Sequence, residues 1–134
     1  MARRNPQHAA WRAAIEDAWN RRADLTVVEI DAATRPLVDE VLDAVERGEL
    51  RIAEPVPKGG WQVNEWLKKA VLLSFRVSES ELVEAEPTPF WDKVPLRFSG
   101  FGEAEFRDLG ARVVPGAVVR RGAHIGRDVV LMPS

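Results

Sequence analysis

Few side chains in this 134-residue chain are suited to acid–base or metal chemistry. It has no cysteine and two histidines, His8 and His124, and no His/carboxylate cluster stands at metal-ligand spacing. The pattern therefore predicts no bound metal, no thiolate nucleophile and no Ser-His-Asp constellation. His124 follows a predicted inward alanine, so we expect it to point into solvent. A role at a subunit interface or in catalysis is the alternative.

One arginine differs from the others. Arg112 is followed by Val113 and Val114, where its aliphatic stem should be packed and its guanidinium held in one place. A guanidinium held in this way can bind a carboxylate through two parallel hydrogen bonds. An ion pair with Glu105 or Asp108 is an equally good alternative.

Two loops also invite a binding interpretation. Segment 90–98 combines aromatic residues with Asp92 and Lys93 and is bounded by prolines, which keep a segment extended and at an edge. It could close over a ligand, although wedging against the core is favoured. Loop 56–60 contains glycines and a lysine but lacks the Gly-Lys-Ser/Thr ending of a P-loop. We therefore expect a hairpin-like turn there.

The element that would position Arg112 is a six-residue repeat. Aliphatic residues recur at positions 113, 119, 125 and 131, small or β-branched ones recur at 117, 123 and 129, and turn-type pairs separate them. This period predicts a coil of a parallel β-helix, which takes three hexads. Two ordinary strands joined by glycine turns are the alternative. Because a solenoid needs about three or more stacked repeats, we expect the chain to be the front of a longer protein.

Upstream of the repeat, apolar spacing predicts three longer helices and one short one. They cover about 9–22, 35–47 and 65–77, and then 102–110 with a glycine stop. Thr34 precedes the second helix, whose core face is Val38, Val41, Leu42 and Val45. The third is the most apolar and should be nearly buried, with Asn64 as its N-cap. Its Lys68, Lys69 and Arg76 are interpreted as a solvated face, with an anion-binding patch as the alternative.

The remaining segments predict short strands and connections. Residues 25–28 look β-like, 49–54 alternate between polar and apolar as a half-buried strand does, and 78–89 suggest a surface loop or weak edge strand. The predicted domains are a tail over residues 1–8, an α/β domain over 9–110 and the start of a β-helix over 111–134. The fold class is α+β.

Composition excludes several classes of protein. Apolar residues make up 46% of the chain, charged residues 30%, and the net charge is −2. Neither a nucleic-acid footprint nor a basic membrane surface is indicated. No apolar run is long enough for a secretory signal or a membrane span. We expect a cytoplasmic protein.

Several segments, in this order and at these spacings, carry a family resemblance: residues 66–76, Asp92-Lys93-Val94-Pro95, Arg112-Val113-Val114-Pro115 and residues 130–134. They closely resemble the N-terminal part of the tetrahydrodipicolinate N-succinyltransferase family. Residues 20–23 and 48–54 share the likeness, which covers nearly all of 9–134.

The resemblance implies a homotrimeric, left-handed β-helix acyltransferase of the diaminopimelate route to lysine. Such an enzyme transfers a succinyl group from succinyl-CoA, a cosubstrate rather than a tightly bound cofactor, to the amino group of a cyclic-imine-derived dicarboxylate. An arginine of the Arg-Val-Val-Pro segment contacts the dicarboxylate in this family, which makes Arg112 the expected substrate-binding residue. The family's catalytic carboxylates and CoA groove belong to later coils. We therefore expect no catalytic residue in this chain, and no turnover by it alone.

A second class of function also fits the sequence. A single coil leaves a strand edge exposed, and such an edge is a template for pairing with another chain. The chain could then be a non-catalytic oligomerisation or protein-interaction module.

Overall fold

The computed structural model describes residues 6–79, 81–83 and 89–134. The chain divides into two compact units, Met1–Glu79 and Ser80–Ser134. The predicted boundary between residues 110 and 111, where a β-helix would begin, stays a prediction.

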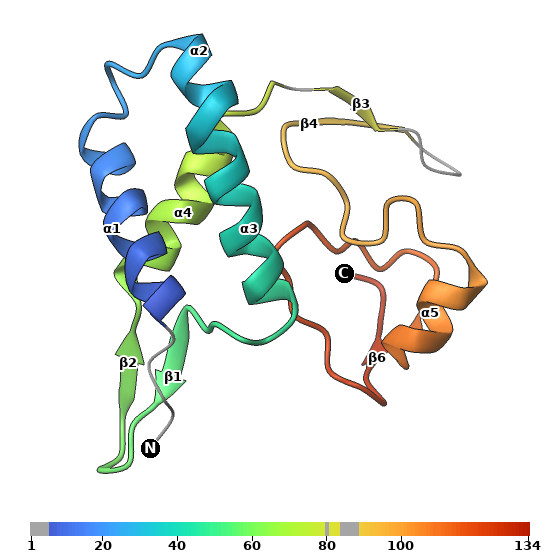
Figure 1. The fold of residues 1–134 in the computed structure, drawn as a ribbon. Helices are drawn as coiled ribbons and strands as arrows, with labels where there is room; N and C mark the ends of the chain where they lie inside the picture. Colours follow the sequence, from blue (N-terminus) through green and yellow to red (C-terminus); the bar gives the residue numbers. More distant parts are fainter. Residues whose placement is uncertain (1–5, 80, 84–88) are drawn as a thin grey trace. The chain divides into compact units, whose positions relative to one another are not determined.

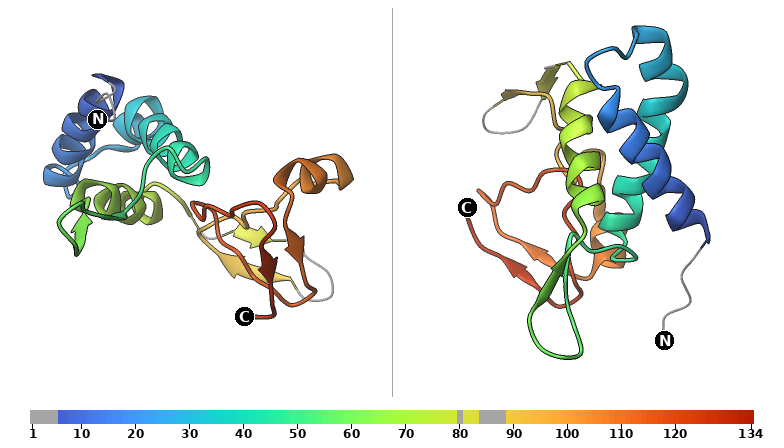
Figure 2. Two further views of the ribbon diagram at one scale, coloured as in Figure 1. Left: turned by 90° about the horizontal axis from the view of Figure 1, so that it is seen from below. Right: turned by 90° about the vertical axis from the view of Figure 1, so that its left-hand side faces the viewer.

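The first unit is a group of helices with a projecting hairpin (Figure 1). Helix α4 packs against α1 and α3, and α1 packs against α3. Figure 2 shows these three helices side by side, with the hairpin leaving their lower end. The elements are α1 (Pro6–Asn20), α2 (Val27–Glu29), a π-helical turn η1 (Ile30–Thr34), α3 (Arg35–Glu46), β1 (Ala53–Pro55), β2 (Trp61–Val63) and α4 (Glu65–Arg76).

The core of this unit lies between α1, α3 and α4. The predicted face of α3 is buried, as are Trp66, Ala70, Leu73 and Val77 of the α4 stripe. Burying each large apolar side chain contributes about 1.5–3 kcal/mol, so α4, which contacts both other helices, is the energetic centre of the unit. The buried cluster comprises Ile15, Ala18, Val38, Val41, Leu42, Val45, Trp66, Leu67, Ala70 and Leu73, with Trp11 and Trp19 half-buried against it.

The beginning of α1 differs from the prediction. The helix starts at Pro6, so residues 6–8 are helical and not part of a tail. Proline suits the first turn of a helix because its missing N–H would have no partner there. Residues 1–5 lie outside the described part of the chain.

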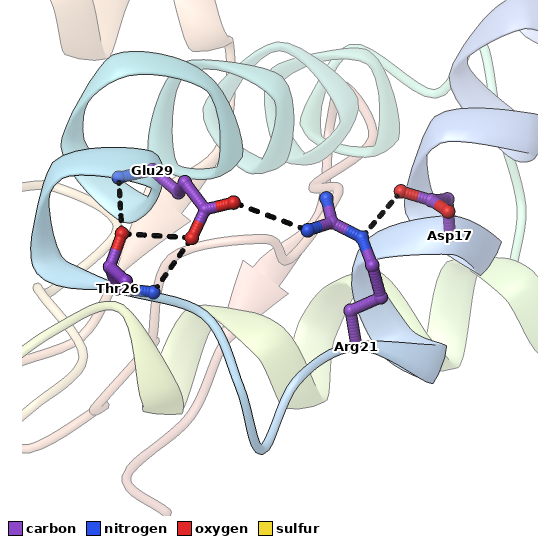
Figure 3. A network of polar contacts seen from close by, with 4 residues as sticks. All are labelled: Asp17, Arg21, Thr26 and Glu29. Atoms are coloured by element: carbon purple, nitrogen blue, oxygen red, sulfur yellow. Dashed lines mark hydrogen bonds and ion pairs between the residues drawn. The ribbon is translucent and has the colours of Figure 1, made fainter.

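The predicted β-like stretch at 25–28 is wrong. Thr26 is instead the N-cap of α2: its Oγ1 accepts a hydrogen bond from the Glu29 N–H, and the Glu29 carboxylate accepts one from the Thr26 N–H. Figure 3 shows this capping box and its extension through Arg21, which pairs with both Glu29 and Asp17. A reciprocal cap satisfies two backbone donors at once, and it outweighs the β preference of Val27 and Val28.

Thr34 directly precedes α3, as predicted, but the helical path begins earlier in the chain. It lies at the end of η1, has helical dihedral angles and makes no side-chain cap. The wider turn has a physical cause, because Pro36 has no N–H to donate and its ring crowds the carbonyl one turn earlier. The Arg35 N–H reaches back to Ile30 O, so the helical path continues past the proline.

The predicted strand at 49–54 is shorter and lies later than expected. The N–H groups of Glu49 and Leu50 donate to Ala44 O, which winds these residues onto the end of α3 instead of extending them. Strand β1 pairs antiparallel with β2, with Ala53 opposite Val63 and Pro55 opposite Trp61. The predicted turn at 56–60 is confirmed, with both of its glycines at positive φ.

Two polar residues of α4 behave differently from expectation. Asn64 holds the N-cap position but makes no side-chain cap; its Nδ2 donates to Arg51 O at 2.7 Å, tying the hairpin base to the preceding loop. Lys69 is not a solvated side chain, because its Nζ pairs with Glu16 of α1. The α4–α1 contact therefore has a polar component.

In the described residues of the second unit, 81–83 and 89–134, there are two small sheets and one helix. Strand β3 pairs antiparallel with β4, and β5 pairs parallel with β6. The predicted weak strand within 78–89 is thus present at 81–83, and positions 84–88 lie outside the described residues. The elements are β3 (Glu81–Val83), β4 (Phe90–Asp92), α5 (Glu103–Leu109), β5 (Arg112–Val113) and β6 (Val130–Leu131).

The six-residue repeat has a clear burial pattern. Positions 113, 119, 125 and 131 are half-buried, as are Ala117 and Ala123, whereas Val129 is 37% exposed. Strands β5 and β6 are joined in register, Arg112 with Val130 and Val113 with Leu131. Each residue of β5 is therefore paired with the residue that lies three hexads further along the chain.

Candidate functional site

The backbone of Arg112 is fixed at the start of the parallel pair. Its N–H donates to Val129 O at 2.9 Å, and two residues later the Val114 N–H donates to Leu131 O at 3.0 Å. Because parallel strands are tied by evenly spaced bonds of this kind, both the position and the direction of Arg112 are set by its partner strand.

The turn before Arg112 is equally defined. Helix α5 ends at Gly110, which has a φ of 67°, and the Asp128 N–H donates to Gly110 O at 2.8 Å. The guanidinium of Arg127 donates to Asp108 O at 2.9 Å. The Arg127 guanidinium lies so close to Gly110 that a Cβ added to Gly110 would sit 3.1 Å from Arg127 Cζ. The predicted glycine stop is confirmed, and Arg127 satisfies one of the last carbonyls of α5.

The Arg112 side chain is exposed, contrary to the expectation that its stem would be packed. The reason is the pleat: successive strand residues point to opposite faces, and the half-buried neighbour Val113 takes the inner one. Among residues 6–79, 81–83 and 89–134, the Arg112 guanidinium has no hydrogen-bond or ion-pair partner, so the alternative ion pair with Glu105 or Asp108 is not formed. A cation on a fixed backbone remains available to an external anion.

Asp92 of the second predicted loop has a structural partner. Its carboxylate accepts hydrogen bonds from the Lys93 N–H at 2.8 Å and from Arg120 at 3.0 Å. The Lys93 N–H, followed by the positive charge of Arg120, holds the pKa of the Asp92 carboxyl below its usual value. Asp92 is therefore an ionised anchor, which makes it a poor proton donor at neutral pH.

Segment 95–98 lies against the six-residue repeat. Arg97 N–H donates to Val119 O, Arg121 N–H donates to Pro95 O, and the Arg97 side chain donates to Ala123 O. Phe98 packs with two other phenylalanines, at 101 and 106. Phe98 is thus held in a small aromatic cluster, whereas Phe90 and Trp91 of the same segment are 40% and 72% exposed, so wedging of the whole segment against the core stays a prediction.

The remaining predicted site residue, His124, is exposed, as expected. Within the described part of the chain, no group of three histidine, aspartate or glutamate side chains could hold a metal ion. Nor is any helix among those residues long and apolar enough to cross a membrane.

The pairing of Arg120 with Asp92 and the binding of Arg127 to the end of α5 were not predicted from the sequence. Arg120 stands 28 residues from Asp92, and Arg127 stands 19 residues from Asp108. The six-residue repeat could have predicted the contact of Arg127. Asp128 lies three hexads after Gly110, and residues three hexads apart are paired, so Arg127 is expected beside the end of α5.

Comparison with known proteins covers both units. Residues 10–77 match the family model described as tetrahydrodipicolinate N-succinyltransferase N-terminal. A 2,3,4,5-tetrahydropyridine-2,6-dicarboxylate N-succinyltransferase from Xylella fastidiosa Temecula1 is 60% identical over 121 residues, which is 90% of this chain and 44% of the relative. A protein of the same name from Actinobacillus succinogenes is 48% identical over 122 residues, which is 91% of this chain and 44% of the relative. Another from Yersinia enterocolitica is 49% identical over 120 residues, which is 90% of this chain and 43% of the relative.

The chain spans less than half the length of these curated relatives. The family model nevertheless matches half of the chain, over the helical unit built around α1, α3 and α4. The relatives' identity extends over nine tenths of the chain. This protein belongs to the tetrahydrodipicolinate N-succinyltransferase family.

Proposed function

We propose that this chain forms the N-terminal part of an enzyme that transfers a succinyl group from succinyl-CoA to the amino group of a cyclic-imine-derived dicarboxylate in diaminopimelate and lysine synthesis. The supporting observation is the 48–60% identity to relatives named as N-succinyltransferases, which covers about nine tenths of the chain. Succinyl-CoA is a cosubstrate in this proposal, and no tightly bound cofactor is assigned.

Arg112 is the proposed contact for a substrate carboxylate. Three observations support this role: its backbone is fixed by the bond to Val129 O, its side chain is exposed, and no described residue neutralises its charge. A guanidinium in this state can make two parallel hydrogen bonds to one carboxylate. The energetic cost of orienting it is reduced, because the strand has already fixed its backbone.

The proposed fold of residues 111–134 is the first coil of a left-handed parallel β-helix within a homotrimer. The parallel pairing of residues three hexads apart and the half-burial of every sixth residue support such a coil. A cytoplasmic location belongs to the same proposal.

The proposal assigns no catalytic acid or base to these 134 residues, and it predicts that they do not turn over substrate by themselves. Acyl transfer to an amine needs a positioned group that removes a proton from the amine. In this proposal, that group lies in the part of the relatives beyond the matched region.

A chimera tests the function directly. This chain would replace the matched segment of the Xylella fastidiosa relative, and succinyl-CoA-dependent acylation of tetrahydrodipicolinate would be measured for the chimera, the relative and the 134-residue chain. We expect activity from the chimera and none from the chain alone. A folded chimera without activity would contradict the function, whereas turnover by the chain alone would contradict the assignment of catalysis to the rest of the relative.

One observation favours the second class of function, a self-associating module. Val118, Val130 and Met132 of the second unit are 49%, 49% and 64% exposed, and association with another chain could cover such apolar side chains. If association alone were the function, the chain would oligomerise in sedimentation experiments and the chimera would be inactive.

A further inference from the structure

A groove of about 420 Å³ opens on the first unit. Helix α1, the segment after α3, the β1–β2 hairpin and the start of α4 all contribute to its walls. Leu50, which is half-buried, and Trp66, which is 7% exposed, supply the apolar part of its lining. Most of the residues that line the groove are polar or charged, which suits a small polar ligand more than an apolar one.

Two arginines line this groove without partners of their own. Neither Arg12 nor Arg51 makes a side-chain hydrogen bond or ion pair to any residue in 6–79, 81–83 or 89–134. Other arginines of the same unit are paired, such as Arg35 with Asp31. Each unpaired guanidinium can donate two parallel hydrogen bonds to one carboxylate.

One carboxylate in the same wall is positioned by amides. Glu54 is half-buried, and its Oε1 accepts a long hydrogen bond of 3.4 Å from Asn64 Nδ2. Gln62 Nε2 donates in turn to Asn64 Oδ1 at 3.4 Å. Since Glu49, which also lines the groove, is already held by Arg47 at 2.7 Å, Glu54 is the carboxylate best able to receive an ammonium group.

Negative charge continues beside the groove. A smaller hollow of about 230 Å³ shares His8 and Glu49 with it and is also lined by Glu40 and Asp43. A ligand that carries only negative charge would be repelled by these carboxylates, and one that carries only positive charge would be repelled by Arg12 and Arg51. The distribution favours a ligand with both signs.

We propose that this groove binds a small amino dicarboxylate: its carboxylates pair with Arg12 and Arg51, its ammonium pairs with Glu54, and its methylene chain lies against Leu50 and Trp66. This site lies in the first unit, away in sequence from Arg112. The inference does not depend on the proposed acyl transfer.

The test uses one ligand and two analogues that each lack one group. The 134-residue chain would be titrated with L-2-aminoadipate, with adipate, which lacks the ammonium, and with L-norleucine, which lacks the second carboxylate. Calorimetry would give the affinities, and NMR would follow the Trp66 indole and the side-chain amides of Gln62 and Asn64. We expect L-2-aminoadipate to bind about tenfold more tightly than either analogue and to shift those signals. Absence of binding at millimolar concentration, or equal binding of adipate, would overturn the proposal.

Substitutions then test which side chain binds each charged group of the ligand. Arg12→Gln and Arg51→Gln should each weaken L-2-aminoadipate binding by about tenfold. Glu54→Gln should weaken it while leaving adipate binding unchanged or stronger. Arg76→Gln removes an exposed arginine outside the groove and should have no effect. An equal loss of L-2-aminoadipate affinity in all four variants would contradict the site. If a variant does not fold, the comparison of the three ligands on the unsubstituted chain still tests the proposal. The acylation assay of the chimera reports separately on the proposed function.

Discussion

Arg112 and Val130 face each other in parallel strands, and the bond from Arg112 N–H to Val129 O fixes the arginine at the first residue of β5. The pairing joins Arg112 to the residue that lies three hexads further along the chain. Its exposed guanidinium is therefore displayed from a position set by backbone bonds and not by side-chain packing.

In the chimeric enzyme, Arg112→Ala should raise the KM for the dicarboxylate by about 10–100-fold, because a charged hydrogen-bonding partner of one carboxylate is lost. The KM for succinyl-CoA should stay nearly unchanged. Arg107→Ala is a matched control, since Arg107 is also exposed but is paired with Glu103. An unchanged dicarboxylate KM in Arg112→Ala would contradict the assigned contact.

Gly110→Ala should destabilise the second unit by about 1–2 kcal/mol, because Gly110 has a φ of 67°, which costs a residue with a Cβ. The new Cβ would also press on the Arg127 guanidinium. Urea unfolding monitored by fluorescence would measure the loss. Gly126→Ala is the control: a Cβ there makes an ordinary 3.7 Å contact with Val129, so equal destabilisation by the two variants would rule out the conformational explanation.

Lys69 and Glu16 should show a favourable coupling of about 1 kcal/mol in a double-mutant cycle of Lys69→Met and Glu16→Gln. Their side chains are 29% and 33% exposed, so water screens the pair less than a surface pair. The same cycle on Arg107 and Glu103, both 77% exposed, provides the comparison and should show no measurable coupling. Equal coupling energies in the two cycles would show that partial burial does not strengthen the Lys69–Glu16 pair.

Glu29 should make stability depend on pH in the acid range. The Thr26 backbone N–H, then the Thr26 hydroxyl and Arg21, lower the pKa of Glu29 below its usual value. A carboxyl whose pKa is lower in the folded state stabilises the fold above its unfolded pKa, about 4.3, and this contribution disappears as pH falls through the folded pKa. The free energy of unfolding of Glu29→Gln should therefore approach that of the unsubstituted chain as pH falls from about 7 to 3. Glu79→Gln controls for the loss of one negative charge, and a pH-independent difference for Glu29→Gln would refute the linkage.

Leu67→Ala should cost about 2–5 kcal/mol in unfolding free energy, because Leu67 is 1% exposed within the core of the first unit. Leu72→Ala removes the same atoms from the same helix at a position that is 43% exposed, and should cost about 0.5 kcal/mol. Thermal unfolding would compare the two. Similar losses would mean that α4 does not present the buried face described here.

The parts of the fold that follow from periodicity were predictable. The buried faces of α3 and α4 obey the spacing of a helix, and Gly110 ends α5 in the conformation that glycine allows. The prediction for residues 25–28 was wrong because Val27 and Val28 suggested a strand. Their side chains are 73% and 76% exposed, so the capping box of Thr26 and Glu29 decides the conformation instead of burial.

The candidate site was predictable in position but not in detail. The six-residue repeat predicted that Arg112 stands where the coil begins, and Arg112 is the first residue of β5. Which face of the strand its side chain takes, however, depends on the pairing with β6. The pairing of Asp92 with Arg120 joins residues 28 apart, and such contacts arise from tertiary structure that no local pattern encodes. The groove lined by Arg12 and Arg51 likewise unites four separate segments.

The packing of α1 on α4 has a consequence for the order of folding. Ile15 is fully buried in a cluster with Leu67 and Leu73, so α1 cannot complete its core until all of α4 has been synthesised. Strands β5 and β6, in contrast, meet across only three hexads. Because contacts between distant residues form more slowly than local ones, the apolar stripe of α1 waits longer for its partner helix during synthesis than β5 waits for β6.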